Sequence, residues 1–198
     1  MTRIALIGSA GRGEDSARMD YALYRRMVGA AEAFVREQPR PWELVSGAAA
    51  WADHTAVSLF LDGKADSLTL HLPCAFVRAS EKPLQLAMFD PRSECGKTAN
   101  HYHRLFTQHL LGAGQLPESL DEIDFAIERG ARVAVHDGFH ARNLQVGRVD
   151  ALLAMTFGPG GAPKDGGTAH TWRHSPAPLK RHVSLWALSR EPAQRSLF

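Results

Sequence analysis

The sequence has few cysteines, no long apolar run and no strong excess of charge of one sign. Only Cys74 and Cys95 are present in 198 residues, and they form no C-x-x-C pair of the kind that binds a metal. A chain of this length buries a sizeable core without crosslinks. We therefore expect both to be reduced thiols in a cytoplasmic protein rather than a disulfide. Neither a metal nor a cofactor is expected.

The missing apolar run excludes a membrane-spanning helix, so no membrane partner is expected. The opening letters MTRIALIG reach a glycine after a handful of apolar residues, which is typical of a first strand and not of a secretion signal. The 23 basic and 21 acidic residues nearly balance at a formal charge of +2. This balance gives no support for a broad nucleic-acid-binding face, although the basic segment 170–182 could contact a phosphate.

Short apolar runs alternate with helical patterns along the chain. Helices are predicted from Asp15 or Ser16 to about Arg36, over 97–111 and over 118–129. Strands are predicted at 3–8, 42–46, 67–72, 132–136, 151–157 and 183–188. The alternation predicts an α/β fold with a doubly wound parallel sheet of Rossmann-like type. We expect one domain over residues 1–190, with a helical insertion at about 74–130, and a tail over 191–198.

A glycine-containing loop follows the first predicted strand, with the letters G-S-A-G-R-G. Glycines such as Gly8 and Gly11 let a backbone approach a phosphate, Ser9 offers a hydroxyl, and Arg12 offers a bidentate donor. The loop lacks the Gly-Lys-Ser/Thr ending of a P-loop. It is predicted to bind ligand.

A second loop of small residues, S-G-A-A-A-W-A-D-H, follows the strand at 42–46. Gly47 and Ala48 would let the next helix approach a phosphate or ribose, and Asp53 could accept hydrogen bonds from sugar hydroxyls. The alternative is that the small residues only permit close helix packing and that Asp53 is a charge in the first helical turn.

The third and most informative stretch is 138–172. It contains His140, Arg142 and Asn143 on a predicted helix and then an apolar run at 151–157 that is typical of a strand buried on both faces. A glycine-rich loop follows, ending in the ligand-binding candidates Gly166, Gly167 and Thr168, with His170 two residues further on. Because ligands bind at the carboxyl ends of parallel strands, the three loops are predicted to form one nucleotide pocket.

These segments resemble the LOG-type nucleotide phosphoribohydrolases and the wider SLOG nucleotide-binding superfamily. In that family H-x-R-K precedes a strand and G-G-x-G-T-x-x-E, and here H-x-R-N at 140–143 precedes the strand and the G-G-T of 166–168. The letters S-G-A-A-x-x-A-D-H resemble the family's S-G-G-A-x-G-x-D. Two departures matter. Residues 159–165 enlarge the glycine loop, and Thr171 replaces the family's glutamate, which removes the expected acid/base group.

The resemblance leaves two functions open. One is a sensor or sequestering module for a phosphorylated nucleoside or nucleotide-derived ligand, and the other is a nucleotide N-glycosidase or related transferase. Hydrolysis needs an acid/base group and stabilisation of the departing base. Arg142 is predicted to stabilise the base, and His170 titrates near neutrality. The candidate carboxylates are Asp53, Glu14, Asp137 and Asp165.

Two other segments are candidates for binding a metal or a partner. His101, His103 and His109 do not have the i, i+4 spacing that lets two imidazoles share a zinc, so they are expected to face solvent or phosphate. The ending Q-R-S-L-F resembles the Q-x-x-L-F peptides that dock on the bacterial sliding clamp. Gln194, Leu197 and Phe198 would make that contact, or the last two fold back on the body. The sequence leaves a homo-oligomer open.

Overall fold

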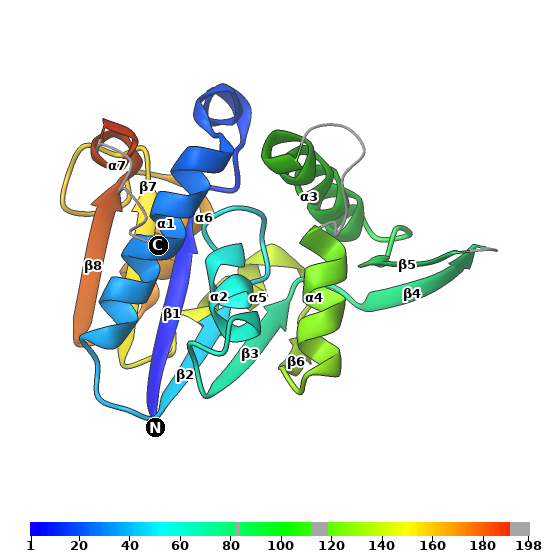
Figure 1. Cartoon of the computed structure of the whole chain (residues 1–198), viewed down its shortest axis with the longest axis horizontal. Coiled ribbons are helices and arrows are strands. Elements are labelled where there is room, and N and C mark those ends of the chain that lie inside the picture. Colours follow the sequence, from blue (N-terminus) through cyan, green and yellow to red (C-terminus); the bar gives the residue numbers. More distant parts are fainter. Residues whose placement is uncertain (82–83, 112–118, 191–198) are drawn as a thin grey trace, which may run out of the picture.

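Six parallel strands form one sheet, in the order β6-β3-β2-β1-β7-β8 (Figure 1). The computed structural model describes residues 1–81, 84–111 and 119–190. The strands are β1 (Thr2–Gly8), β2 (Trp42–Ser46), β3 (Ser67–Leu72), β6 (Arg132–Val135), β7 (Ala151–Thr156) and β8 (Leu179–Ser184). The predicted α/β fold with a doubly wound parallel sheet is confirmed.

The path of the chain through the sheet reverses between β1 and β7. From β1 the chain proceeds outward through β2, β3 and β6, and it then returns to the other side of β1 as β7 and β8. The connections that leave β1 and β7 therefore run to opposite faces, and a crevice is left outside the carboxyl ends of these two strands. The loops after β1 and β7 flank this crevice.

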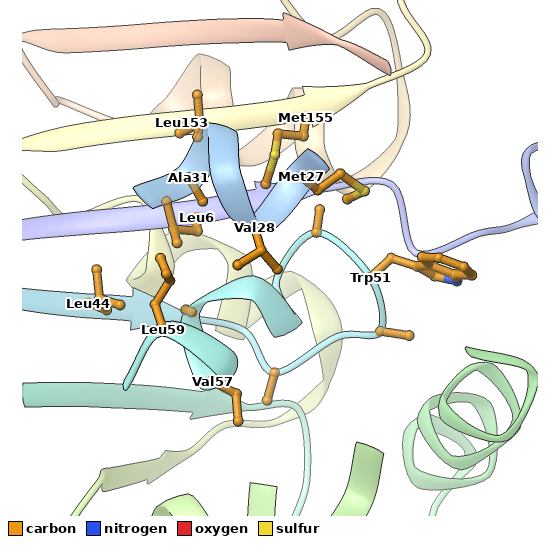
Figure 2. Close-up of a cluster of buried hydrophobic side chains, with 14 of the residues drawn as sticks. Leu6, Met27, Val28, Ala31, Leu44, Trp51, Val57, Leu59, Leu153 and Met155 are labelled. Atoms are coloured by element: carbon orange, nitrogen blue, oxygen red, sulfur yellow. The ribbon is translucent and has the colours of Figure 1, made fainter. Parts of the chain in front are cut away.

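Helices cover both faces of the sheet (Figure 1). The helices α1 (Tyr21–Arg36), α2 (His54–Leu61) and α7 (Leu185–Arg190) lie on one face, and α5 (Gly138–Val146) and α6 (Gly166–His174) on the other. Alternate residues of β1 enter two separate buried clusters, one on each face. Figure 2 shows part of the larger cluster, in which Leu6, Leu44 and Leu153 of the sheet lie close to α1. Burial on both faces explains why the central strands β1 and β7 are nearly continuous apolar runs.

The segment between β3 and β6, predicted as a helical insertion, also contains a ribbon of two strands. β4 (Phe76–Glu81) and β5 (Leu84–Phe89) pair antiparallel and project from the body (Figure 1), and α3 (Glu94–Leu111) and α4 (Ser119–Glu128) follow. Arg78 of the ribbon pairs with Asp124 and Glu128 of α4 at 2.9 and 2.6 Å. These ion pairs and the side-chain hydrogen bonds of Asn100 to the backbone of Phe89 connect the ribbon to the helices.

Two predicted elements are displaced by about four residues or more, and the helix predicted to begin at Lys97 begins at Glu94. The first long helix begins at Tyr21, because the carboxylate of Asp20 accepts the N–H of Leu23 at 2.7 Å and caps it there. A short 3-10 helix, η1 (Gly13–Arg18), precedes it. The last strand is Leu179–Ser184 rather than 183–188, because the apolar letters VSLWAL span the junction between β8 and α7.

Both cysteines are free thiols. Of the helices in the described ranges, none has both the length and the apolarity needed to cross a bilayer. The tail at 191–198, which includes Gln194, Leu197 and Phe198, lies outside the described residues.

Candidate functional site

A cavity of about 890 Å³ opens at the carboxyl ends of β1 and β7. This volume is typical of a small-molecule or cofactor site. The wall includes most of the residues predicted for binding or catalysis: Gly8, Ser9, Arg12, Asp53, His140, Arg142, Asn143, Gly166, Gly167, Thr168 and His170. In the described structure Gly11, Gly47 and Ala48 lie behind this wall. Asp137, a candidate carboxylate, is likewise outside it, whereas Glu14 and Asp165 are part of it.

Arg142 is a buried cation in the wall of the cavity, with 7% of its surface exposed. Its Nη1 donates to Asp53 Oδ2 at 3.2 Å, and its Nε has no hydrogen-bond partner among the described residues. Burial lowers the pKa of the Arg142 guanidinium, and Asp53 opposes this effect. A buried guanidinium with an unpaired donor is stabilised by an anion, so the wall beside Arg142 is suited to a phosphate or carboxylate.

Asp53 joins two parts of the site. Its Oδ2 accepts the N–H of Gly47 and the Nη1 of Arg142, both at 3.2 Å. Burial raises the pKa of Asp53, whereas Arg142 and the nearby backbone N–H groups of Gly8 and Gly47 lower it. Asp53 is predicted to accept hydrogen bonds from sugar hydroxyls, and in this structure its carboxylate holds Arg142 beside the loop after β2.

Gly47 leaves the space that the guanidinium of Arg142 occupies. A Cβ atom at Gly47 would lie 1.4 Å from Arg142 Nη1. The next residue, Ala48, has a left-handed φ of 51°, and its carbonyl is 3.0 Å from Nε2 of His103 in α3. His103 is therefore buried, and the prediction that it faces solvent or phosphate is wrong. The burial of its ring, together with the nearby His54, lowers the pKa of His103 to about 3.

The two hydroxyls predicted to contact phosphate donate within the protein. Ser9 Oγ donates to Asp15 Oδ2 at 2.8 Å, and Thr168 Oγ1 donates to the carbonyl of Gly8 at 2.8 Å. The N-terminus of α6 instead offers backbone N–H groups, because the preceding residue, Asp165, makes no capping side-chain hydrogen bond within the described ranges. Such N–H groups and the helix dipole together favour an anion.

Three histidine rings on α5 and α6 contact one another at tilted angles, 47° between His140 and His170 and 31° between His170 and His174. The ring centroids of His140 and His170 are 4.1 Å apart, and those of His170 and His174 are 4.2 Å apart. Burial, His140, His174 and Arg173 lower the pKa of His170, so its ring is neutral at pH 7. In the described part of the chain no group of three or more His, Cys, Asp or Glu side chains is arranged to hold a metal ion.

A second cation, Arg12, is held by aromatic rings. Its guanidinium carbon lies 4.9 Å from the ring centroid of Tyr102 and 5.7 Å from that of Phe139. The guanidinium of Arg142 is also 5.7 Å from the Phe139 centroid. Arg12 and Arg142 therefore share one aromatic neighbour and add positive charge to the same side of the cavity.

Several wall residues were not predicted from the sequence: Arg18, Phe139, Phe157, Lys164 and Trp186. Phe157 is the last residue of the predicted strand 151–157, and its side chain is predicted to lie in the core. Trp186 lies in a run that was assigned to a strand. Trp186 reaches the cavity because it lies on α7, directly after β8. No sequence motif predicts this helix, so its place in the wall could not be predicted.

The fold and the site define a Rossmann-like α/β protein with a cavity at the carboxyl edge of its parallel sheet and a buried arginine, Arg142, in the cavity wall. No family model matches the chain. The chain is 32% identical over 190 residues to "Uncharacterized protein R261" of Acanthamoeba polyphaga mimivirus, and the match covers 92% of this chain and 96% of the relative. The chain therefore belongs to the same family as this mimivirus protein.

Proposed function

We propose that this protein binds a phosphorylated nucleoside or nucleotide-derived ligand, as a sensor or sequestering module related to the SLOG superfamily. The observation that carries the proposal is Arg142, a buried guanidinium in the cavity wall whose Nε has no partner among the described residues. The N-terminus of α6 and Arg12 belong to the same wall. Together they favour a phosphate at this end of the cavity.

Binding is favoured over hydrolysis because three of the four wall carboxylates, Glu14, Asp15 and Asp53, are already paired. Thr171, at the position of the family's glutamate, is 3% exposed, and its hydroxyl donates to the Gly167 carbonyl. Asp53 is paired with Arg142, and Arg18 contacts both Glu14 and Asp15. A glycosidase needs a carboxylate that can activate water or contact the ribose. Asp165 and the neutral His170 are the remaining candidates for the alternative N-glycosidase activity.

Calorimetric titration with AMP, GMP, CMP and UMP tests the proposal. We expect the parent protein to bind at least one of them, and Arg142→Lys to weaken binding about tenfold or more, since an ammonium cannot replace a planar bidentate donor. Arg173→Lys is the matched control, because Arg173 is an exposed residue of α6. Binding that is equal in Arg142→Lys and the parent would remove Arg142 from the site.

The same four nucleotides distinguish binding from hydrolysis. We expect no catalytic release of free base when they are incubated with the purified protein, because the family's glutamate is absent. Catalytic release that is lost in Arg142→Lys but kept in Arg173→Lys would instead establish the N-glycosidase alternative. In that case His170→Asn should remove a limb of the pH–rate profile below 6.5, because the pKa of His170 is lowered.

A further inference from the structure

The end of the cavity that faces α7 is aromatic. Phe157, which follows β7, and Trp186 in α7 both line the cavity, with ring centroids 5.3 Å apart and an interplanar angle of 71°. Trp186 is 40% exposed, whereas Leu185 and Leu188 of the same helix are buried. The two buried leucines therefore hold the short helix against the core, and the indole of Trp186 is left in the cavity wall.

This aromatic end lies across the sheet edge from the cationic end. Arg142 belongs to α5 on one face of the sheet and pairs with Asp53 after β2, whereas Trp186 belongs to α7 on the opposite face, after β8. Three strand spacings separate β2 from β8 in the sheet. At about 4.8 Å per spacing, the two ends are on the order of 14 Å apart. A bound phosphate alone would leave the aromatic end unoccupied.

One protein group covers part of the indole. The guanidinium carbon of Arg18 lies 4.8 Å from the Trp186 ring centroid. Arg18 is also paired with Glu14 at 3.1 Å and with Asp15 at 3.8 Å, and its side chain is 37% exposed. Exposed pairs of this kind contribute little to stability, so a planar ligand group can displace Arg18 from the ring.

We propose that Phe157 and Trp186 form a base subsite, in which the aromatic base of the ligand stacks on Trp186 in place of Arg18. The inference rests on the proposed function, since it assumes a phosphate at the Arg142 end. Stacking on an indole accepts every nucleobase, because each has a π face. The subsite therefore distinguishes a nucleotide from a sugar phosphate, and it discriminates weakly among the bases.

The test compares nucleoside monophosphates with ribose 5-phosphate by calorimetric titration. The parent should bind its preferred nucleotide about 5- to 150-fold more tightly than ribose 5-phosphate, the range expected from one base stacked on an aromatic side chain. Trp186→Leu should abolish this preference and leave the affinity for ribose 5-phosphate unchanged, which also shows that the variant is folded. Trp186→Phe should keep most of the preference, because it keeps a ring.

Tryptophan fluorescence gives a second measurement. Trp172 lies on α6, packed against the smaller buried cluster, and is the matched control. Nucleotide should quench the emission of Trp172→Phe as it does the parent, and should not quench Trp186→Phe. Equal affinity of the parent for ribose 5-phosphate and nucleotide, or an undiminished preference in Trp186→Leu, would overturn the base subsite and leave the proposed function standing. If the parent binds neither ligand, the proposed function itself fails.

Discussion

At the scale of single residues, Gly47 determines whether Arg142 can occupy its place in the wall. A methyl group at this position would overlap Arg142 Nη1. We expect Gly47→Ala to lower the affinity for nucleoside monophosphates at least tenfold and to lower the free energy of unfolding by about 1–3 kcal/mol, as overpacking does. Calorimetric titration and urea unfolding measure the two effects.

Gly161→Ala is the control for Gly47→Ala. Gly161 lies in the enlarged loop after β7, and a Cβ there would have no atom of the described residues within 4 Å. This variant should retain both affinity and stability. If Gly47→Ala binds nucleotides as tightly as Gly161→Ala does, the placement of Arg142 does not depend on the glycine.

Single residues also mark how far the site could be predicted. Glycine spacing and the position of the loop after a strand predicted that the N-terminus of α6 contributes to the site, and the resemblance of H-x-R-N at 140–143 to the SLOG motif implied Arg142; both line the cavity. The pairing of Asp53 with Arg142 and of Thr168 with Gly8 could not be predicted, because these partners are far apart in the sequence and only the fold brings them together.

At the scale of elements, the hydrogen bond from Thr168 to Gly8 joins α6 to the end of β1. We expect Thr168→Val to reduce stability by about 1 kcal/mol, because the Gly8 carbonyl loses its hydroxyl donor. Nucleotide affinity should fall as well, since the N-terminus of α6 loses its fixed position. Thr168→Ser keeps the donor and should behave like the parent in urea unfolding and in titration. A Val variant as stable as the Ser variant would show that the bond contributes nothing.

The bounds of an element could be predicted where proline or glycine marks them in the sequence. The strands Trp42–Ser46 and Ser67–Leu72 were predicted to the residue, because Pro41 and Gly47 flank the first and Pro73 follows the second. The edge strand β8 contains the polar letters K-R-H directly before Val183, so only its last two residues were included. The break between η1 and α1 was missed because Asp20, and not Asp15 or Ser16, caps the long helix.

At the scale of the whole molecule, buried neutral histidines predict a loss of stability in acid. The pKa of His103 is about 3 in the folded chain and near 6.5 when unfolded. Between these two values the unfolded state binds a proton that the native state excludes. The contribution of His103 to the free energy of unfolding is therefore complete above pH 6.5 and is lost progressively as the pH falls toward 3. At pH 4.5 the loss from His103 amounts to about 2–3 kcal/mol.

The ring of His103 contacts Ser119 Oγ through Nδ1 at 2.9 Å and the Ala48 carbonyl through Nε2 at 3.0 Å. The variant His103→Gln isolates this effect, because glutamine does not titrate and can still hydrogen-bond Ser119 or the Ala48 carbonyl. Its free energy of unfolding should be lower than that of the parent at pH 7, and the difference should shrink by about 2–3 kcal/mol at pH 4.5. Urea unfolding at the two pH values measures this change. A difference that stays constant with pH would mean that His103 does not titrate differently in the two states.

The position of β1 in the middle of the sheet has a consequence for how the chain folds. One neighbour, β2, begins at Trp42, but the other, β7, begins only at Ala151. Contacts across so many residues form slowly, because a long loop must close first. During synthesis the β7-facing edge of β1 therefore remains unpaired until most of the chain has been made, and such an apolar edge can pair with other chains. Aggregation is thus most probable in the interval between the synthesis of β1 and that of β7.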